Sequence, residues 1–132
     1  MREELSTYPA VLEVIQTYID GCAGPDDNKI RSVFHPNAQL FGVFSGKTVV
    51  FPIEAWIDRV MGDPKPADDA RITPAPTKGP AWWVDSVDVT ENMARVVVIS
   101  RFLDVWYTDL MTLLQTEDGW KIVNKTFTYE KK

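Results

Sequence analysis

The chain has 132 residues, of which 45% are hydrophobic and 25% are charged, and its net charge at pH 7 is −5. This composition is typical of a folded globular protein, and the length is sufficient for one continuous core. We therefore expect a single domain spanning residues 1–132. An acidic chain with no cluster of Lys and Arg is poorly suited to nucleic acid or an anionic membrane, so we expect neither as a partner.

Cys22 is the only cysteine, which excludes an internal disulfide and a metal centre built on thiolates. The positions of His and Cys match no metal-binding spacing, so we expect no metal ion and no cofactor. The segment Met1–Leu5 lacks the apolar run of a secretory signal, and no stretch approaches the roughly 20 apolar residues of a membrane span. A cytoplasmic location is the resulting expectation.

The N-terminal part of the chain shows the periodicity of a helix. Apolar residues recur between Val11 and Cys22 at the spacing of one helical face. Thr7 is the expected N-cap, Pro9 is tolerated in the first turn, and Gly24 with the proline after it ends the helix.

Two further helices are expected. Asp26 or Asp27 can cap a short second helix that ends before His35 and its following proline. Pro52 opens a third helix. One face of that helix carries Ile53, Trp56, Ile57 and Val60.

β-Branched and alternating runs predict six strands. In chain order they are 38–44, 48–51, 81–89, 93–101, 105–116 and 120–129. The stretch Gly62–Pro80 breaks every regular pattern and carries five prolines, which indicates either a lid or rim over a site or a partly disordered loop. Helices followed by a meander of long strands predict an α+β fold, with the helices covering one face of a curved antiparallel sheet.

Several segments together resemble the nuclear transport factor 2-like superfamily, in particular its bacterial lumazine-binding branch, which is related to SnoaL-like and ketosteroid isomerase-like proteins. The matching segments are Tyr18–Gly21, Val33–Ala38, Tyr107–Leu110 and Gly119–Phe127. The resemblance implies a cone-shaped fold in which a curved sheet wraps around three helices and leaves a hydrophobic cavity. Its members include isomerases, cyclases, dehydratases and many pocket proteins, so the fold alone does not determine the function.

The resemblance to ketosteroid isomerases suggests catalytic roles for three residues if the chain is an enzyme. Tyr18 is similar to their oxyanion-binding tyrosine and Asp109 to its acidic partner. The position of their general base is occupied by Gly42, which cannot accept a proton. His35, the only histidine, would then have to act as the base, although a histidine before a proline is more often a local hydrogen-bonding residue.

Lys125 distinguishes this chain from those isomerases. Strand alternation places it with Val123, Phe127 and Tyr129, on the face that the resemblance directs toward the cavity. If Asp109 shares that face, the two form an ion pair that keeps the carboxylate as an acceptor and offers a ligand both signs of charge. A one-residue shift in register would instead place the pair on the outer face.

The expected ligand site combines polar and aromatic residues, which suit a largely apolar, planar small molecule. Its expected members are Tyr18, Phe41, Trp56, Asp109, Lys125 and Phe127. Tyr18 and Trp56 are also compatible with simple core packing. Two alternatives stay open: an isomerase, dehydratase or cyclase that uses Tyr18 and Asp109, and a non-catalytic interaction module whose cavity is filled by its own side chains.

The opposite face of the last two strands predicts a homodimer interface through the sheet. Its residues are a mixture of apolar and threonine side chains. They are Thr108, Leu110, Thr112, Leu114, Ile122, Asn124 and Thr126.

Overall fold

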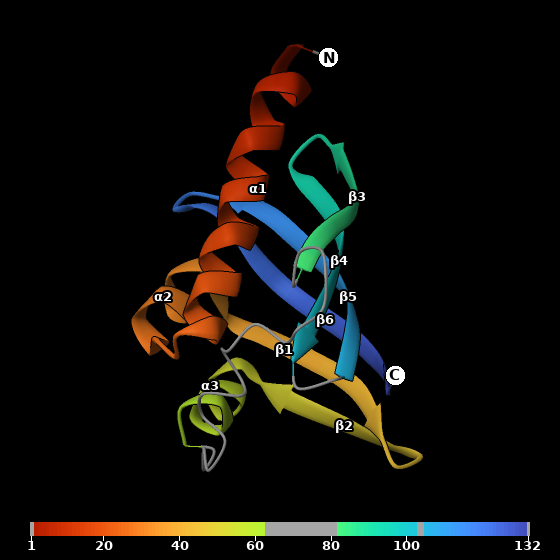
Figure 1. Ribbon diagram of the computed structural model, residues 1–132. Helices are drawn as coiled ribbons and strands as arrows, with labels where there is room; N and C mark the ends of the chain where they lie inside the picture. The colour runs from red at the N-terminus through yellow and green to blue at the C-terminus, as the bar shows by residue number, and fades with distance from the viewer. Residues whose placement is uncertain (1, 63–81, 103–104, 132) are drawn as a thin grey trace.

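A computed structural model describes residues 2–62, 82–102 and 105–131 (Figure 1). The helices and strands follow the expected order. They are α1 (Arg2–Ala23), α2 (Asp27–Val33), β1 (Phe34–Phe44), β2 (Lys47–Pro52), α3 (Ile53–Gly62), β3 (Trp82–Thr90), β4 (Met93–Phe102), β5 (Val105–Thr116) and β6 (Gly119–Lys131). The expected loop at 62–80 lies outside the described residues, apart from Gly62 at the end of α3.

The six strands form one sheet in the order β2-β1-β6-β5-β4-β3. The sheet curves around the helices (Figure 1), and the expected α+β fold is confirmed. The expectation of a purely antiparallel sheet needs one correction, because β1 pairs with β6 in parallel. That pairing is possible because a helix and four strands separate β1 from β6, which gives the chain room to return in the same direction.

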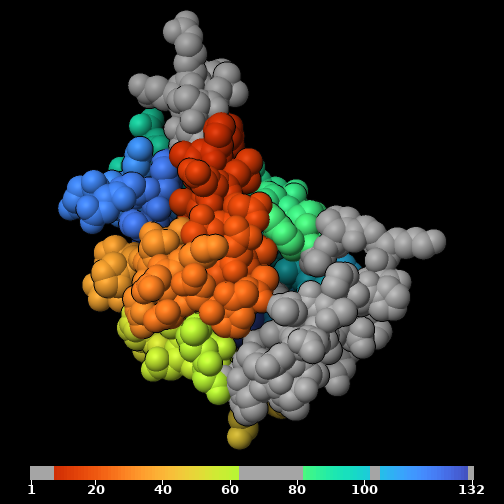
Figure 2. All heavy atoms as spheres, turned by 60° about the vertical axis from the view of Figure 1, so that its left-hand side comes forward, coloured from red at the N-terminus to blue at the C-terminus, as the bar shows by residue number. Residues whose placement is uncertain are grey.

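The helices cover the inner face of the sheet, with α1 lying along it and α2 and α3 near one end (Figure 1). Figure 2 shows α1, α2 and α3 side by side on this face. The core forms between the helices and the sheet. Its fully buried side chains include Val11, Ile15, Ile30, Leu40, Ile57, Val96, Val98, Met111, Leu113 and Ile122. None of the described helices is both long and apolar enough to cross a bilayer.

The first helix starts earlier than expected. Thr7 is not its N-cap, because α1 already begins at Arg2 and Pro9 lies inside it. Proline lacks the N–H that would donate to the carbonyl four residues earlier, so one backbone hydrogen bond is missing there. The expected end is confirmed, since α1 stops at Ala23, directly before Gly24.

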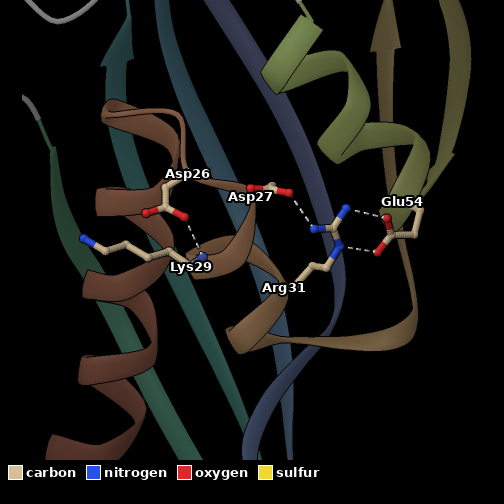
Figure 3. A network of polar contacts seen from close by, with 5 residues as sticks. All are labelled: Asp26, Asp27, Lys29, Arg31 and Glu54. Atoms are coloured by element: carbon tan, nitrogen blue, oxygen red, sulfur yellow. Dashed lines mark hydrogen bonds and ion pairs between the residues drawn. The ribbon is translucent and has the colours of Figure 1, made fainter.

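The second helix is held to the third by a network of exposed charges (Figure 3). Asp26 is the N-cap of α2, and its side chain accepts a hydrogen bond from the backbone N–H of Lys29 at 3.1 Å. Arg31 donates to Asp27 at 2.7 Å and to both carboxylate oxygens of Glu54, in α3, at 2.9 Å each. This two-point contact fixes the position of α3 beside α2.

Strand β1 begins at Phe34 and contains an irregularity that the sequence pattern did not reveal. Its register with β6 shifts between Phe34 and Gln39, so the segment around Pro36 is not paired in step with β6. A proline cannot donate to the ladder, which favours such a bulge. After the irregularity, Ala38, Leu40 and Gly42 are buried on the inner face.

A second irregularity lies in β6. Thr112 of β5 pairs with Asn124, but the next residue, Leu113, pairs with Ile122, so Val123 is an extra residue. The bulge reverses the alternation of inward and outward side chains in the part of β6 that precedes Val123. Ile122 is therefore fully buried, and its expected place on the outer, dimer-forming face is wrong.

Candidate binding pocket

A cavity of about 260 Å³ lies between α1, α3 and the inner face of the sheet. Tyr18 of α1 and Trp56 of α3 line its helical side. Asp109 of β5, with Lys125 and Phe127 of β6, lines the sheet side. Five of the six residues expected to form the site thus border the same cavity.

Three buried polar residues are linked in a chain of hydrogen bonds on the cavity wall. Lys125 Nζ donates to the Tyr18 hydroxyl oxygen at 2.5 Å, and the Tyr18 hydroxyl donates to Asp109 Oδ2 at 3.3 Å. Lys125 Nζ also lies 3.7 Å from Asp109 Oδ2. The direction of donation is that of an ammonium, a neutral phenol and a carboxylate.

Local structure explains why these three side chains meet. Tyr18 lies three residues after the fully buried Ile15, so it shares the inner stripe of α1. In the register of the β5–β6 pair, Asp109 lies opposite Phe127 and Met111 lies opposite Lys125. All four strand residues therefore point to the same, inner face of the sheet.

The Lys125 ammonium is surrounded by aromatic rings. It lies 4.5 Å from the ring centre of Trp56, 5.1 Å from that of Tyr18 and 5.5 Å from that of Phe127. The rings of Tyr18 and Trp56 are stacked with their centres 6.1 Å apart. Ring faces attract a cation, and this partly offsets the cost of removing Lys125 from water.

Asp109 is not fully satisfied by its neighbours. The residue is 3% exposed, yet Oδ1 is buried without a hydrogen-bond partner among the described residues. Burial raises the pKa of the carboxyl, while Lys125 and the hydroxyl of Tyr18 oppose that rise. Burial, followed by the charge of Asp109, raises the pKa of Tyr18, which keeps the phenol neutral.

Gly42 is buried beneath the ring of Phe127. A Cβ atom at Gly42 would lie only 2.3 Å from the Cζ atom of that ring. Phe127 thus occupies the space into which a side chain at this position would project. Gly42 stands at the position of the general base of ketosteroid isomerases. The packing of Phe127 therefore explains why this chain has no carboxylate there.

His35 does not line the cavity. It lies in the irregular start of β1, where its Nδ1 accepts a hydrogen bond from the backbone N–H of Asn37 at 3.0 Å. The buried Phe34 beside it takes the inward position instead. His35 therefore has the local hydrogen-bonding role that the sequence analysis gave as the alternative.

Phe41 is the one expected pocket residue that the structure places elsewhere. Its neighbours Leu40 and Gly42 are buried on the inner face, and successive strand residues point to opposite faces. Phe41 pairs with Val50 and with the exposed Thr126. Its expected place in the pocket is therefore wrong.

Several lining residues were missed by the sequence analysis. They are Phe44, Phe51, Arg59, Ser100 and Tyr107, together with the apolar residues beside Tyr18 and Trp56. Strand alternation offered a signal for two of them, since Ser100 follows Val96 and Val98 at spacings of two, and Tyr107 precedes Asp109 by two. Arg59 lies three residues after Trp56, which places both near one side of α3.

The described residues contain no group of three or more His, Cys, Asp or Glu side chains arranged to hold a metal ion. Cys22 lines the cavity one helical turn after Tyr18, and after burial and the charge of Asp109 it also raises the pKa of that phenol. The polar chemistry of the wall thus rests on hydroxyl, carboxylate, ammonium and guanidinium groups.

Comparison with solved structures gives the same architecture. A nuclear transport factor 2-like (NTF2-like) protein of unknown function from Silicibacter pomeroyi DSS-3 has a TM-score of 0.78 at 21% identity, over 96% of this chain and 98% of that one. A second from Shewanella baltica OS155 has a TM-score of 0.78 at 22% identity, over 97% of each chain. A "putative ketosteroid isomerase" from Shewanella frigidimarina NCIMB 400 has a TM-score of 0.64 at 18% identity, over 90% of this chain and 94% of that one. These likenesses establish the fold.

The sequence itself supports a narrower assignment. No curated protein matches the chain. The model of the family described as "Putative lumazine-binding" matches residues 6–128, which include every described residue of the cavity wall. The resemblance noted from the sequence is confirmed: the chain belongs to this family, and its fold is that of the NTF2-like proteins.

Proposed function

We propose that the cavity binds a small, largely apolar and planar molecule, with Tyr18, Asp109 and Lys125 as its polar anchors. The observation that carries this proposal is Asp109 Oδ1, a buried acceptor on the cavity wall that has no partner among the described residues. A buried polar atom left unpaired costs about 1–3 kcal/mol. A ligand that donates to this oxygen removes that cost.

The charged pair is also costly for a purely structural role. Lys125 and Asp109 are 6% and 3% exposed, and their ion pair spans 3.7 Å. Replacing a buried ion pair by apolar residues is often neutral or stabilising. A pair that keeps an open hydrogen-bonding position beside a cavity is better explained by ligand capture than by stability.

The shape of the wall supports a flat ligand. Phe51, Trp56 and Phe127 border the cavity, and aromatic side chains present flat faces for offset or edge contacts. A cavity of about 260 Å³ bordered by the described side chains also counts against the alternative of an interaction module with a filled core.

An isomerase-type mechanism is less well supported. It requires the Tyr18 hydroxyl to donate to the substrate, but here that hydroxyl donates to Asp109. The wall has no base at Gly42, and His35 is not among the residues that line the cavity. The geometry therefore favours binding over proton transfer.

The proposed function is tested by calorimetric titration with planar compounds, including lumazine and uncharged naphthols. We expect at least one to bind the wild type, and Asp109→Asn or Lys125→Met to weaken that binding by about tenfold or more. Asp88→Asn, which removes an exposed carboxylate on the outer face, is the matched control. Equal affinity in all four proteins would show that the anchors are wrong.

We also propose a homodimer formed through the outer face of the sheet. This face exposes Trp83, Met93, Leu110 and Leu114 to between 39% and 49%. Such apolar exposure on several neighbouring strands favours a protein partner, and a second copy supplies a self-complementary surface. Leu110→Glu should lower the mass measured by light scattering, whereas Leu12→Glu on α1 should not.

A further inference from the structure

The described lining of the cavity carries more positive than negative charge. Arg59 lies in α3 at the cavity wall, and its guanidinium carbon is 5.5 Å from the ring centre of Phe51. Within the described lining, Lys125 and Arg59 are the cations and Asp109 is the carboxylate. Lys125 is paired with Asp109, so the charge of Arg59 has no acid to match it in that lining. This imbalance occurs in a chain whose net charge is −5.

Arg59 differs from Lys125 in its surroundings. Lys125 is almost fully buried, whereas Arg59 is exposed. Its guanidinium is therefore reachable by a ligand that enters from solvent. Arginine presents a planar set of donors that matches a carboxylate at two points.

We propose, building on the proposed function, that the ligand is a small aromatic acid that carries a hydroxyl or N–H group away from its carboxylate. The carboxylate pairs with Arg59, and the ring lies against Phe51 and Trp56. The hydroxyl or N–H group donates to Asp109 Oδ1. The ligand thus completes both polar groups that the described wall leaves open.

The donor group, the negative charge and the size of this ligand each match a separate feature of the cavity wall. A ligand with acceptors alone would leave Asp109 Oδ1 unpaired, and buried unpaired acceptors discriminate strongly against such molecules. A cationic ligand would meet Arg59 and Lys125 and be repelled. The cavity volume of about 260 Å³ lies below the roughly 300–1,000 Å³ of sites for drug-sized ligands, so one or two rings fill it.

The experiment uses matched probes that change one feature at a time. The parent series is para-hydroxybenzoate, para-hydroxyphenylacetate and para-hydroxycinnamate, which vary the span between carboxylate and hydroxyl. For the tightest member, the methyl ester removes the charge and the para-methoxy acid removes the donor. Tyramine keeps the ring and hydroxyl but carries a cation. We expect the parent acid to bind at least about tenfold more tightly than each of these three analogues.

Two variants test whether the carboxylate of the ligand contacts Arg59 and its hydroxyl group contacts Asp109. Arg59→Gln should weaken binding of the acid by about tenfold or more and leave the methyl ester unchanged. Asp109→Asn should weaken the hydroxy acid but not the methoxy acid. Arg95→Gln removes an exposed cation of the outer face that pairs with Asp88, and it should alter neither affinity.

The outcomes separate this inference from the proposed function. If the ester binds as tightly as the acid, or if Arg59→Gln leaves the acid unaffected, the aromatic-acid inference is overturned. The proposed function still stands in that case if binding depends on Asp109. If only uncharged naphthols or lumazine bind, the inference again fails alone. If no probe of either set binds the wild type, both proposals fail.

Discussion

The molecule contains two charge clusters that differ in almost every respect. On the surface, Arg31 meets Asp27 and Glu54 at 2.7–2.9 Å in a near-ideal arrangement (Figure 3). In the core, Lys125 and Asp109 lie 3.7 Å apart, and Asp109 Oδ1 has no partner among the described residues. The better geometry therefore occurs on the surface, where water solvates charges and their free-energy cost is small. The poorer geometry occurs in the core, where the cost of removing charges from water is large.

This difference indicates what each cluster does. Exposed ion pairs contribute little to stability because water and salt screen them. The Arg31 cluster serves to orient α3 against α2, and it needs nothing further to be complete. The buried cluster is incomplete and borders a cavity, which is the arrangement expected of a binding site.

The largest expected effect comes from breaking the buried pair. Lys125→Met leaves the Asp109 charge without its counterion, and such changes cost about 3–5 kcal/mol. Urea unfolding at neutral pH measures this loss. The double variant Asp109→Leu with Lys125→Met should recover most of it, because two apolar residues leave no buried charge.

The control for this prediction is Lys47→Met at the exposed β1–β2 hairpin, which should change the free energy of unfolding very little. A loss at Lys125 no larger than that at Lys47 would contradict a buried, paired role for Lys125.

A smaller effect is expected from filling the space beneath Phe127. Gly42→Ala places a methyl group against the ring, and such overpacking costs about 1–3 kcal/mol. The displaced ring also lines the cavity, so ligand affinity should fall as well. Thermal unfolding and titration measure the two effects.

Gly24→Ala is the matched control, because the nearest atom to its added Cβ is 4.0 Å away. Phe127→Leu should relieve the strain of Gly42→Ala, so the two losses should not add. Additive losses would mean that Gly42 and Phe127 do not interact as the structure shows.

The two clusters should respond to pH with opposite signs. Arg31 lowers the pKa of Asp27 and Glu54 below their ordinary values of 3.8 and 4.5. The unfolded chain then binds more protons there, so their contribution to stability is lost as the pH falls below those values. Burial raises the pKa of Asp109, so the folded chain binds more protons at that site. The contribution of Asp109 to stability is most favourable below pH 3.8, the ordinary pKa of an aspartate. It diminishes as the pH rises through the pKa of Asp109 in the folded chain.

Urea unfolding between roughly pH 3 and 7 tests these signs. The stability of Asp109→Asn relative to wild type should rise as the pH increases, because the variant carries no charge to desolvate. Glu54→Gln should lose its disadvantage toward acid pH. Parallel profiles for the wild type and both variants would contradict the pKa shifts.

The smallest expected effect is the loss of the surface cluster. Arg31→Gln should lower stability only slightly, and added salt should remove most of the difference. Thermal unfolding at low and high ionic strength provides the measurement. A large, salt-independent loss would show that Arg31 supports the core rather than the surface.

Much of this fold follows from patterns within single segments. The helical stripe around Ile15 and Tyr18, the cap at Asp26 and the alternation of β5 are short-range features, because one segment buries one face. They were sufficient to predict the order of helices and strands and the common face of Lys125 and Phe127. The start of α1 at Arg2 was missed because Pro9 is also compatible with a first helical turn.

Only the tertiary structure decided the rest. The bulges at Pro36 and Val123 depend on how β6 pairs with two neighbours at once, and the bulge at Val123 sets the burial of Ile122. Tyr18 and Lys125 are 107 residues apart in sequence, so no local pattern brings them together. In the regular stretches of each segment the sequence by itself determined which side chains share a face, whereas the bulge at Val123 overturned that prediction for Ile122. The packing of those faces against one another decided which of them surround the cavity, because contacts between distant segments depend on register and three-dimensional fit.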